Sequence, residues 1–412
     1  MRVTLLRDKR IILGVTGSIA AFKAANLASK LTQAGAQVDV ILTAGAQRFV
    51  TPLTFSALTG RAVHSDMWAG VADPDGHIAH VRLGEHADLL LIAPASAHTI
   101  AKLAHGMADN LLTLTALAAR CPLLLAPAMD GGMYDHPATQ ANLQTLVERG
   151  ALLIEPDEGR FASGLGGRGR LPEPPELLGH VRRALGRVGA LAGRQVVVTA
   201  GGTREALDPV RQFGNRSSGK QGHALAQAAL DAGAEVTLIS SARGLPTPVG
   251  ATRVAVDTAQ EMLEATLAAA RGADALIMAA AVADFRPAQR QTQKLRKRGH
   301  DEGLRLDLEP TADVLLAVSE QRVQYGRPRF LVGFAAESEQ LLQGAAEKLA
   351  RKKLDLVVAN DISAADAGFE VDDNRVTLLA PGRAPEELPL MPKSGVAELV
   401  VARVAGALVQ RA

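Results

Sequence analysis

The chain has 412 residues, of which 45 are Lys or Arg and 43 are Asp or Glu, so its net charge is close to zero. This length predicts two or three domains rather than one, and the charge balance argues against a protein that binds nucleic acid over its whole surface. The single cysteine, Cys121, excludes an intramolecular disulfide framework and fits a reducing cytoplasm.

The N-terminal segment resembles neither a signal peptide nor a membrane anchor. Charged residues interrupt its apolar residues before Ile11. No uninterrupted apolar run elsewhere approaches the length that spans a membrane. We therefore expect a cytoplasmic protein with no membrane partner.

Short apolar strands alternate with alanine-rich helical segments along the chain. Strands are predicted at 11–14, 38–42, 89–93, 123–126 and 152–154, and then at 196–199, 236–239, 275–278, 330–333, 356–359 and 376–379. Continuous apolar strands separated by helices are typical of parallel sheets that are buried on both faces. The sequence therefore predicts an α/β protein with two doubly wound, Rossmann-like domains and mostly parallel sheets.

The boundary between the two domains is predicted near residue 190. The proline-rich segment LPEPPE, one helix and then GRVGALAGR separate the two sets of strands. The halves also resemble each other, since AGAQVDVILTA at 34–44 matches AGAEVTLISSA at 232–242. We expect domains at 1–189 and 190–412.

A long loop follows the first strand of the second domain, where the first domain has only the short turn GVTGSIAAFK. Roughly 17 residues intervene where such turns usually need a handful. The loop contains Arg204, Arg211, Arg216 and Lys220 and ends in NRSSGKQG at a helix N-terminus, an arrangement that suits a phosphate. Asn215 adds a neutral amide that can orient a carbonyl or carboxylate. The loop alone leaves open that Ser217 only caps the helix.

Two more basic segments lie near strand ends of the second domain. One contains Lys294, Arg296, Lys297 and Arg298, and the other places Lys348 and Lys352 on one helical face. Three basic clusters on one sheet predict a polyanion such as a nucleoside triphosphate, without a Walker motif. Asp284 and Asp361 each follow a strand and are candidates to hold a divalent cation, although a structural role is equally open.

Several ordered motifs resemble known families. TAGGTREALDPVRQFGNRSSGKQG, AAAVADFRP, VGFAAE and KLARKKLDLVVAND resemble the phosphopantothenate-cysteine ligase domain of coenzyme A biosynthesis. GVTGSIAAFK, LTAGAQRFVTP, PASAHT, PAMDGGMYDHPATQ and SGLGGRGRLPEP resemble the flavin-dependent phosphopantothenoylcysteine decarboxylase. The two in this order resemble the bacterial bifunctional protein over nearly the whole chain.

For the second domain, the resemblance implies that CTP activates the carboxylate of 4'-phosphopantothenate and that the amine of cysteine attacks the acyl-cytidylate. It implies that Asn215 handles this intermediate and that Lys294 promotes its formation. The residues implied to bind CTP with its Mg²⁺ or Mn²⁺ are Met278, Ala279, Ala280, Asp284 as the metal ligand, Lys294, Thr311, Ala312, Asp313, Val314, Phe334, Lys348 and Lys352. Those expected to bind the acid substrate are Arg211, Asn215, Ser217, Ser218, Gly219 and Lys220.

For the first domain, the resemblance implies FMN. The residues implied to contact it are Gly17, Ser18, Thr43, Ser96 and Thr99. In the family, the flavin oxidises the cysteinyl thiol to a thioaldehyde, which loses carbon dioxide, and the enethiol is then reduced. His80 aligns with the active-site histidine, a base that titrates near neutral pH. PASAHT and PAMD alone would be ordinary turns at strand ends.

Two positions depart from the family pattern. Asp130 stands where an asparagine amide often binds the substrate carboxylate, and Ser163 stands where well-known members have a cysteine that donates the last proton. A hydroxyl is a far weaker acid than a thiol. The departures leave three readings open: another donor, a reaction that stalls at the enethiol, or lost decarboxylation. Cys121 opens an apolar segment and is predicted to be a core residue.

Other classes of function are weaker matches. His77, His80 and His86 lack a cysteine or a third ligand at metal-binding spacing. Neither Tyr134 nor Tyr325 precedes a lysine at the spacing of a short-chain dehydrogenase, and the basic stretch at 286–298 lacks the interleaved aromatic residues of nucleic-acid binders. A non-catalytic flavin-binding protein remains an alternative. The resemblance implies trimers of the decarboxylase domain and dimers of the ligase domain, which together form a homo-oligomeric dodecamer.

Overall fold

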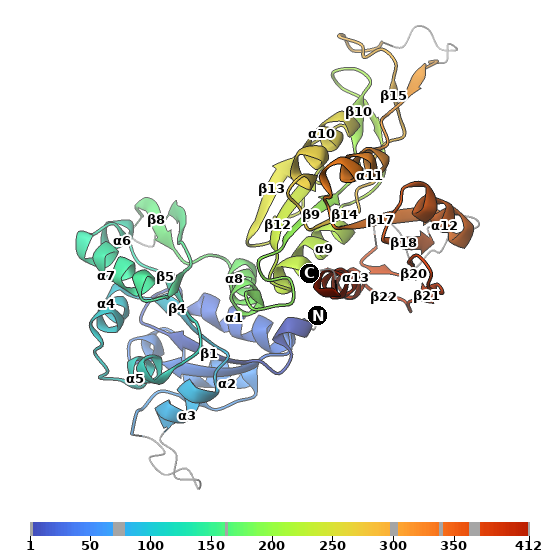
Figure 1. Cartoon of the computed structure of the whole chain (residues 1–412). Helices are drawn as coiled ribbons and strands as arrows, with labels where there is room; N and C mark the ends of the chain where they lie inside the picture. The colour runs from blue at the N-terminus through green and yellow to red at the C-terminus, as the bar shows by residue number, and fades with distance from the viewer. Residues whose placement is uncertain are drawn as a thin grey trace. The chain divides into compact units, whose positions relative to one another are not determined.

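The computed structural model describes residues 3–68, 79–160, 164–296, 304–337, 341–361 and 371–410 (Figure 1). It divides the chain into two compact units, Met1–Gly186 and Arg187–Ala412. This division lies beside the boundary expected from the sequence. Within the described residues, no helix is both long and apolar enough to cross a membrane.

The first unit is built on a six-stranded parallel sheet in the order β3-β2-β1-β4-β5-β6. Its strands are β1 (Arg10–Val15), β2 (Gln37–Leu42), β3 (Val63–His64), β4 (Leu89–Ala95), β5 (Leu123–Pro127) and β6 (Leu152–Leu153). This is the strand order of a doubly wound nucleotide-binding fold, in which ligands bind beyond the carboxyl ends of the strands where the order reverses. That point lies between β1 and β4.

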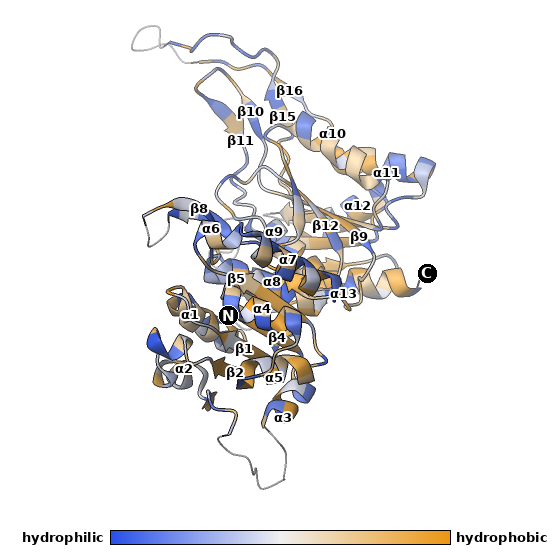
Figure 2. Ribbon diagram, turned by 90° about the vertical axis from the view of Figure 1, so that its left-hand side faces the viewer, coloured by the Kyte–Doolittle hydropathy of each residue, from blue (hydrophilic) through white to orange (hydrophobic). Residues whose placement is uncertain are grey.

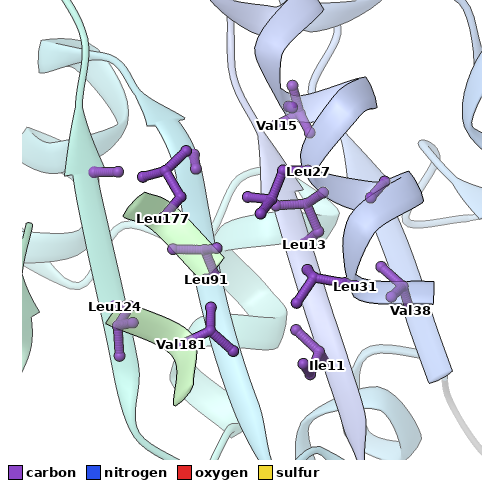
Figure 3. Close-up of a cluster of buried hydrophobic side chains, with 14 of the residues drawn as sticks. Ile11, Leu13, Val15, Leu27, Leu31, Val38, Leu91, Leu124, Leu177 and Val181 are labelled. Atoms are coloured by element: carbon purple, nitrogen blue, oxygen red, sulfur yellow. The ribbon is translucent and has the colours of Figure 1, made fainter. Parts of the chain in front are cut away.

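Helices pack on the two faces of this sheet. They are α1 (Ala21–Gln33), α2 (Pro52–Thr59), α3 (Ala79–His86), α4 (Ala97–His105), α5 (Leu111–Ala118), α6 (Gly131–Tyr134), α7 (Pro137–Glu148) and α8 (Pro174–Gly186), with short 3-10 turns η1 (Thr4–Leu6) and η2 (Ala46–Arg48). Figure 3 shows one face of the core, where Leu27 and Leu31 of α1 and Leu177 and Val181 of α8 meet Leu13 and its neighbours on the strands. A hairpin of β7 (Asp157–Arg160) and β8 (Gly166–Arg170) stands apart from the sheet.

The second unit repeats this order in a larger sheet, β13-β12-β9-β14-β17-β18-β20-β21. Its strands are β9 (Gln195–Ala200), β12 (Glu235–Ser240), β13 (Ala251–Ala255), β14 (Ala275–Met278), β17 (Phe330–Glu337), β18 (Leu356–Asp361), β20 (Val376–Leu379) and β21 (Glu386–Glu387). Pairing is parallel from β13 to β18 and antiparallel for the last two strands. The predicted α/β class with mostly parallel sheets is thus confirmed.

Among the described residues, five helices and three short ladders complete the second unit. The helices are α9 (Lys220–Asp231), α10 (Ala259–Ala270), α11 (Val314–Tyr325), α12 (Leu341–Arg351) and α13 (Lys393–Gln410). The ladders are β10 (Arg204–Ala206) with β11 (Gln212–Gly214), β15 (Phe285–Pro287) with β16 (Leu308–Pro310), and β19 (Asp373–Asn374) with β22 (Met391–Pro392). In Figure 2 the sheet strands are largely apolar. The β10–β11 and β15–β16 ladders lie side by side, and we call the described residues 204–214, 285–296 and 304–310 the arm.

The two similar sequence segments adopt the same local structure. Each begins at the end of a helix, α1 or α9, and passes through a glycine with positive φ, 105° at Gly35 and 94° at Gly233, into a buried strand. Such a backbone conformation costs glycine little and other residues more.

The sequence pattern did not reveal β13. Its residues are mostly exposed at the edge of the sheet and lack a continuous apolar run.

Candidate functional site

The long loop of the second unit forms part of the arm instead of lying flat on the sheet. The carboxylate of Asp208, which is 2% exposed, accepts backbone N–H groups of Val210 and Arg211 at 2.7 Å and of Leu295 at 3.1 Å. These donors outweigh burial and hold the pKa of Asp208 below its ordinary value. The loop is therefore tied to the segment that carries Lys294.

The end of the loop brings Asn215 to the carboxyl end of β14. Its Nδ2 donates to the carbonyl oxygens of Ala281 at 3.2 Å and Val282 at 3.1 Å. A Cβ atom at Gly202 would lie 2.4 Å from the carbonyl oxygen of Asn215, so only glycine permits this close approach. The amide of Asn215 is consequently held beside the segment that follows β14.

Helix α9 then starts at the same end of the sheet. Gly219 adopts a φ of 82° immediately before the helix, and Ser217 and Ser218 precede it. Gly222, in the first turn, packs directly on β9. The loop thus delivers the N–H groups of a helix N-terminus, which favour anions, to the carboxyl ends of the strands.

These elements surround a cavity of about 630 Å³. The structure brings together in its lining most of the residues predicted for the ligase site, namely Asn215, Ser217, Ser218, Gly219, Lys220, Met278, Ala279, Ala280, Asp284, Thr311, Ala312, Asp313, Val314, Phe334, Lys348 and Lys352. Arg216 of the long loop lines it as well. The cavity lies beyond the carboxyl ends of β9, β14 and β17, where a doubly wound fold binds ligands.

Two lysines of the cavity are held by neighbouring oxygens. Lys352, 8% exposed, pairs with Asp313 at 2.8 Å, and Lys348 donates to the carbonyl oxygen of Phe334. Asp313 also caps α11 by accepting the N–H of Leu316 at 3.1 Å. Although burial alone would raise it, the pKa of Asp313 is lowered by Lys352 and this N–H. The carboxylate of Asp313 therefore holds the side chain of Lys352 in place at the cavity.

Some predicted residues lie elsewhere. Lys294 and Arg211 belong to the arm and are exposed, and neither is part of the described lining; Arg211 pairs with Asp208 at 3.4 Å. Arg204 instead bonds to Asp257 at 3.3 Å and to the carbonyl oxygen of Ser241.

The side chains of Lys297, Arg298 and Asp361 lie outside the described residues. Among the residues that are described, no three Asp, Glu, His or Cys residues group as a metal site.

The sequence interpretation missed several lining residues. Those with polar side chains are Gln221, Asn360, Asn374 and Lys393. Asn360 directly follows the strand predicted at 356–359, a position that could have singled it out. Lys393 offered no such signal, because it begins the last helix, far along the chain from the other motifs.

In the first unit, the predicted flavin contacts gather around the ends of β1, β2 and β4. Gly17 follows β1, and a Cβ atom there would lie 3.2 Å from the Cα of Gly45, so two backbone segments meet with no side chain between them. Thr43, after β2, accepts the N–H of Ala46 at 3.2 Å. Ser18 Oγ accepts the N–H of Ala20 at 3.3 Å just before α1.

Ser96 and Thr99 form the start of α4 at the neighbouring strand end. Ser96 caps the helix by accepting the N–H of Thr99 at 3.4 Å, and the two hydroxyl groups lie 3.3 Å apart. Thr16 links this turn to β1 by donating to the carbonyl oxygen of Pro94 at 2.7 Å and accepting the N–H of Ser96 at 2.9 Å. Hydroxyls and backbone N–H groups with small side chains suit the phosphate and ribityl chain of a flavin mononucleotide.

The remaining predicted residues of this unit are less closely grouped. Asp130 caps the short helix α6 by accepting the N–H of Gly132 at 3.1 Å. His80 is the second residue of α3 and is half-buried, whereas Ser163 lies outside the described residues. Cys121 lies just before β5, partly buried against the core, and burial raises the pKa of its thiol.

Both units match known families. Residues 3–186 match the family described as Flavoprotein, and residues 191–408 match the DNA/pantothenate metabolism flavoprotein C-terminal domain. The chain is 44% identical over 404 residues to a coenzyme A biosynthesis bifunctional protein of Bacillus subtilis, covering 97% of this chain and 98% of the relative. It is 45% identical over 412 residues to one of Mycobacterium tuberculosis, covering 97% and 96%. A crystal structure of the C-terminal domain of such a protein matches 54% of the chain and 99% of that domain, with 36% identity and a TM-score of 0.45.

Proposed function

The chain belongs to the family of coenzyme A biosynthesis bifunctional proteins, and we propose from its two sites how it performs the ligase and decarboxylase reactions of that family. The second unit ligates 4'-phosphopantothenate to cysteine, and the first unit decarboxylates the product to 4'-phosphopantetheine. The observation that carries the ligase assignment is the single cavity that unites Asn215 with the lysines Lys348 and Lys352.

The ligase site separates the nucleotide from the acid substrate. CTP would lie over the segment after β14 and the N-terminus of α11, with its phosphates near Lys348 and Lys352. Asp284 offers one carboxylate, and Mg²⁺ (or Mn²⁺) commonly needs only one or two carboxylates when phosphates supply the other oxygens. The substrate carboxylate would attack the α-phosphorus and form the acyl-cytidylate. The bond between the α-phosphorus and its bridging oxygen would break, and that oxygen would leave with the pyrophosphate.

Asn215 would then orient the acyl-cytidylate. Its Nδ2 is already bonded to two backbone carbonyls, which fixes the amide plane against the chain. A fixed amide can direct the acyl group toward the incoming amine of cysteine without the desolvation cost of a charge. Lys294 lies on the arm. It would promote the first step by neutralising charge on the reacting phosphate when the arm brings it to the CTP in the cavity.

In the first unit, the residues present fit FMN. Gly17, Ser18, Thr43, Ser96 and Thr99 would hold its phosphate and ribityl chain, and the close approach of Gly17 to Gly45 places no side chain between these two backbone segments. When bound, FMN supplies the two-electron chemistry that oxidises the thiol and later reduces the enethiol. His80 would act as a base in this site. The carboxylate of Asp130 would point away from the substrate carboxylate, because two like charges repel each other.

The final proton needs a donor other than Ser163. A hydroxyl is too weak an acid for this role. Tyr134 is no better, because burial, followed by its hydrogen bond to Glu155 at 3.0 Å, raises its pKa to about 12. We therefore propose that another group, solvent included, protonates the enethiol in this chain.

A mass-spectrometric assay tests both assignments. Purified protein is incubated with 4'-phosphopantothenate, cysteine, CTP and Mg²⁺, and phosphopantothenoylcysteine and phosphopantetheine are quantified separately. Formation of phosphopantetheine supports both reactions. Product that stops at phosphopantothenoylcysteine refutes the decarboxylase half, and the absence of both products refutes the ligase half.

We also propose an assembly and a location for this protein from its resemblance to the family. We expect small-molecule substrates only, a cytoplasmic location and a homo-oligomer in which decarboxylase units form trimers and ligase units form dimers. Light scattering of the intact protein tests this, because a dodecamer and a monomer differ twelvefold in mass.

A further inference from the structure

Two helices of the ligase unit begin at the same end of its cavity. Lys220 is the first residue of α9 and Lys393 is the first residue of α13, and both lysines line the cavity. The helices pack together, and Gln221 Nε2 donates to the carbonyl oxygen of Lys393 at 3.0 Å. Two partial positive charges from helix N-termini therefore add to two ammonium groups.

This end of the cavity concentrates positive charge in a partly buried place. Lys393 is 6% exposed, and its Nζ donates to the carbonyl oxygen of Val371. Lys220 pairs at 2.7 Å with Asp372, whose side chain is 84% exposed. The negative charge of Asp373 attracts the ammonium group of Lys393. Burial and the repulsion from Lys220 lower the pKa of Lys393 below 10.5. An anion between the two lysines would relieve both effects.

A buried amide at the same cavity also indicates a ligand. Asn360, at the carboxyl end of β18, is 7% exposed and lines the cavity. Its Oδ1 has no hydrogen-bond partner among the described residues. A buried acceptor without a partner is costly, and a hydroxyl or amide N–H of a bound molecule would satisfy it. The cavity thus offers a site for an anion and, nearby, an acceptor for a neutral donor group.

We propose that Lys393, together with Lys220, binds the phosphate of 4'-phosphopantothenate. This inference rests on the proposed ligase function and adds α13 to its site. CTP would use Lys348 and Lys352, so each of the two phosphorylated ligands in the one cavity has its own pair of lysines. The dianionic phosphate would replace the exposed Asp372 as the partner of Lys220, and Asn360 would accept a donor from the pantothenate chain.

The test is Lys393→Met, which keeps most of the side-chain length and removes the charge. Arg403→Met is the matched control, since it removes a cation from the same helix where that cation pairs with Glu386 at 2.7 Å outside the cavity. Steady-state kinetics of the full chain give KM for 4'-phosphopantothenate and for CTP. Loss of a charge-assisted hydrogen bond should raise KM for 4'-phosphopantothenate about 10- to 100-fold, with KM for CTP and kcat within about threefold.

Two further variants separate the outcomes. Lys393→Arg should restore much of the affinity, which a lost packing role would not predict. Lys220→Met, at a more exposed site, should raise the same KM and keeps the test valid if Lys393→Met does not fold. A rise confined to KM for CTP would assign the lysine pair to the nucleotide and overturn the proposal, as would unchanged KM values in both variants. Failure of the ligase function itself would appear differently, as no CTP-dependent product from the unaltered protein.

Discussion

Replacing Gly222 by alanine should destabilise the ligase unit and weaken its anion site. A Cβ atom at this position would lie 2.5 Å from the Cβ of Ala200, 2.8 Å from the carbonyl oxygen of Thr199 and 2.9 Å from the Cα of Ala200. Two of these atoms belong to the backbone of a central strand and cannot rotate away. Helix α9 must therefore move off β9, which carries Lys220 away from the cavity.

The magnitude follows from two opposing effects. Overpacking costs about 1–3 kcal/mol, while alanine in place of glycine within a helix returns up to about 1 kcal/mol. The net loss is about 0–2 kcal/mol, which for a unit of this size lowers Tm by up to roughly 8 °C. Because the helix N-terminus moves, KM for 4'-phosphopantothenate should rise as well.

Calorimetry of the full chain measures this effect, with the ligase transition identified by its shift upward with CTP and Mg²⁺. Gly406→Ala is the matched control. Gly406 lies in α13, and a Cβ atom there meets nothing within 4 Å, so the same substitution should raise stability by about 0.5–1 kcal/mol. Equal Tm changes in the two variants, or a more stable Gly222→Ala protein, would refute the close packing of α9 on β9.

Three further predictions concern single side chains. Lys352→Met should raise KM for CTP about 10- to 100-fold because a charge-assisted contact is lost. Lys353→Met, at the exposed neighbouring position, should leave KM for CTP unchanged. Equal KM values for CTP in the two variants would show that Lys352 does not bind CTP. Ser163→Ala should change phosphopantetheine formation by less than about threefold; a fall of about 10²-fold would make Ser163 the proton donor. Burial lowers the pKa of His223 below its ordinary 6.5, so the unfolded state binds the proton more readily and stability falls as pH drops below 6.5. His223→Gln should flatten this pH dependence of Tm, and an unchanged slope would argue against it.

The sequence alone determined the architecture, because each strand and helix is indicated by the residues within it. A strand buried on both faces, such as Val196–Thr199, must be apolar throughout, and its helices must be amphipathic, so each element carries its own signal. The likeness of 34–44 to 232–242 added the repeat of one fold, and the strand ends located the candidate sites. The residues proposed to bind CTP came from the motifs that resemble the ligase family, because Lys348 and Lys352 precede a strand and Thr311 follows no predicted one.

Only the tertiary structure decided which residues share a cavity. It grouped Asn215 with Lys348 and Lys352, and left Lys294 and Arg211 on an arm outside the described lining. It also added Lys393, which is 173 positions from Lys220 in the chain yet lies beside it because α9 and α13 pack together. Such a contact depends on how distant helices dock on one sheet, and no local pattern of residues records it.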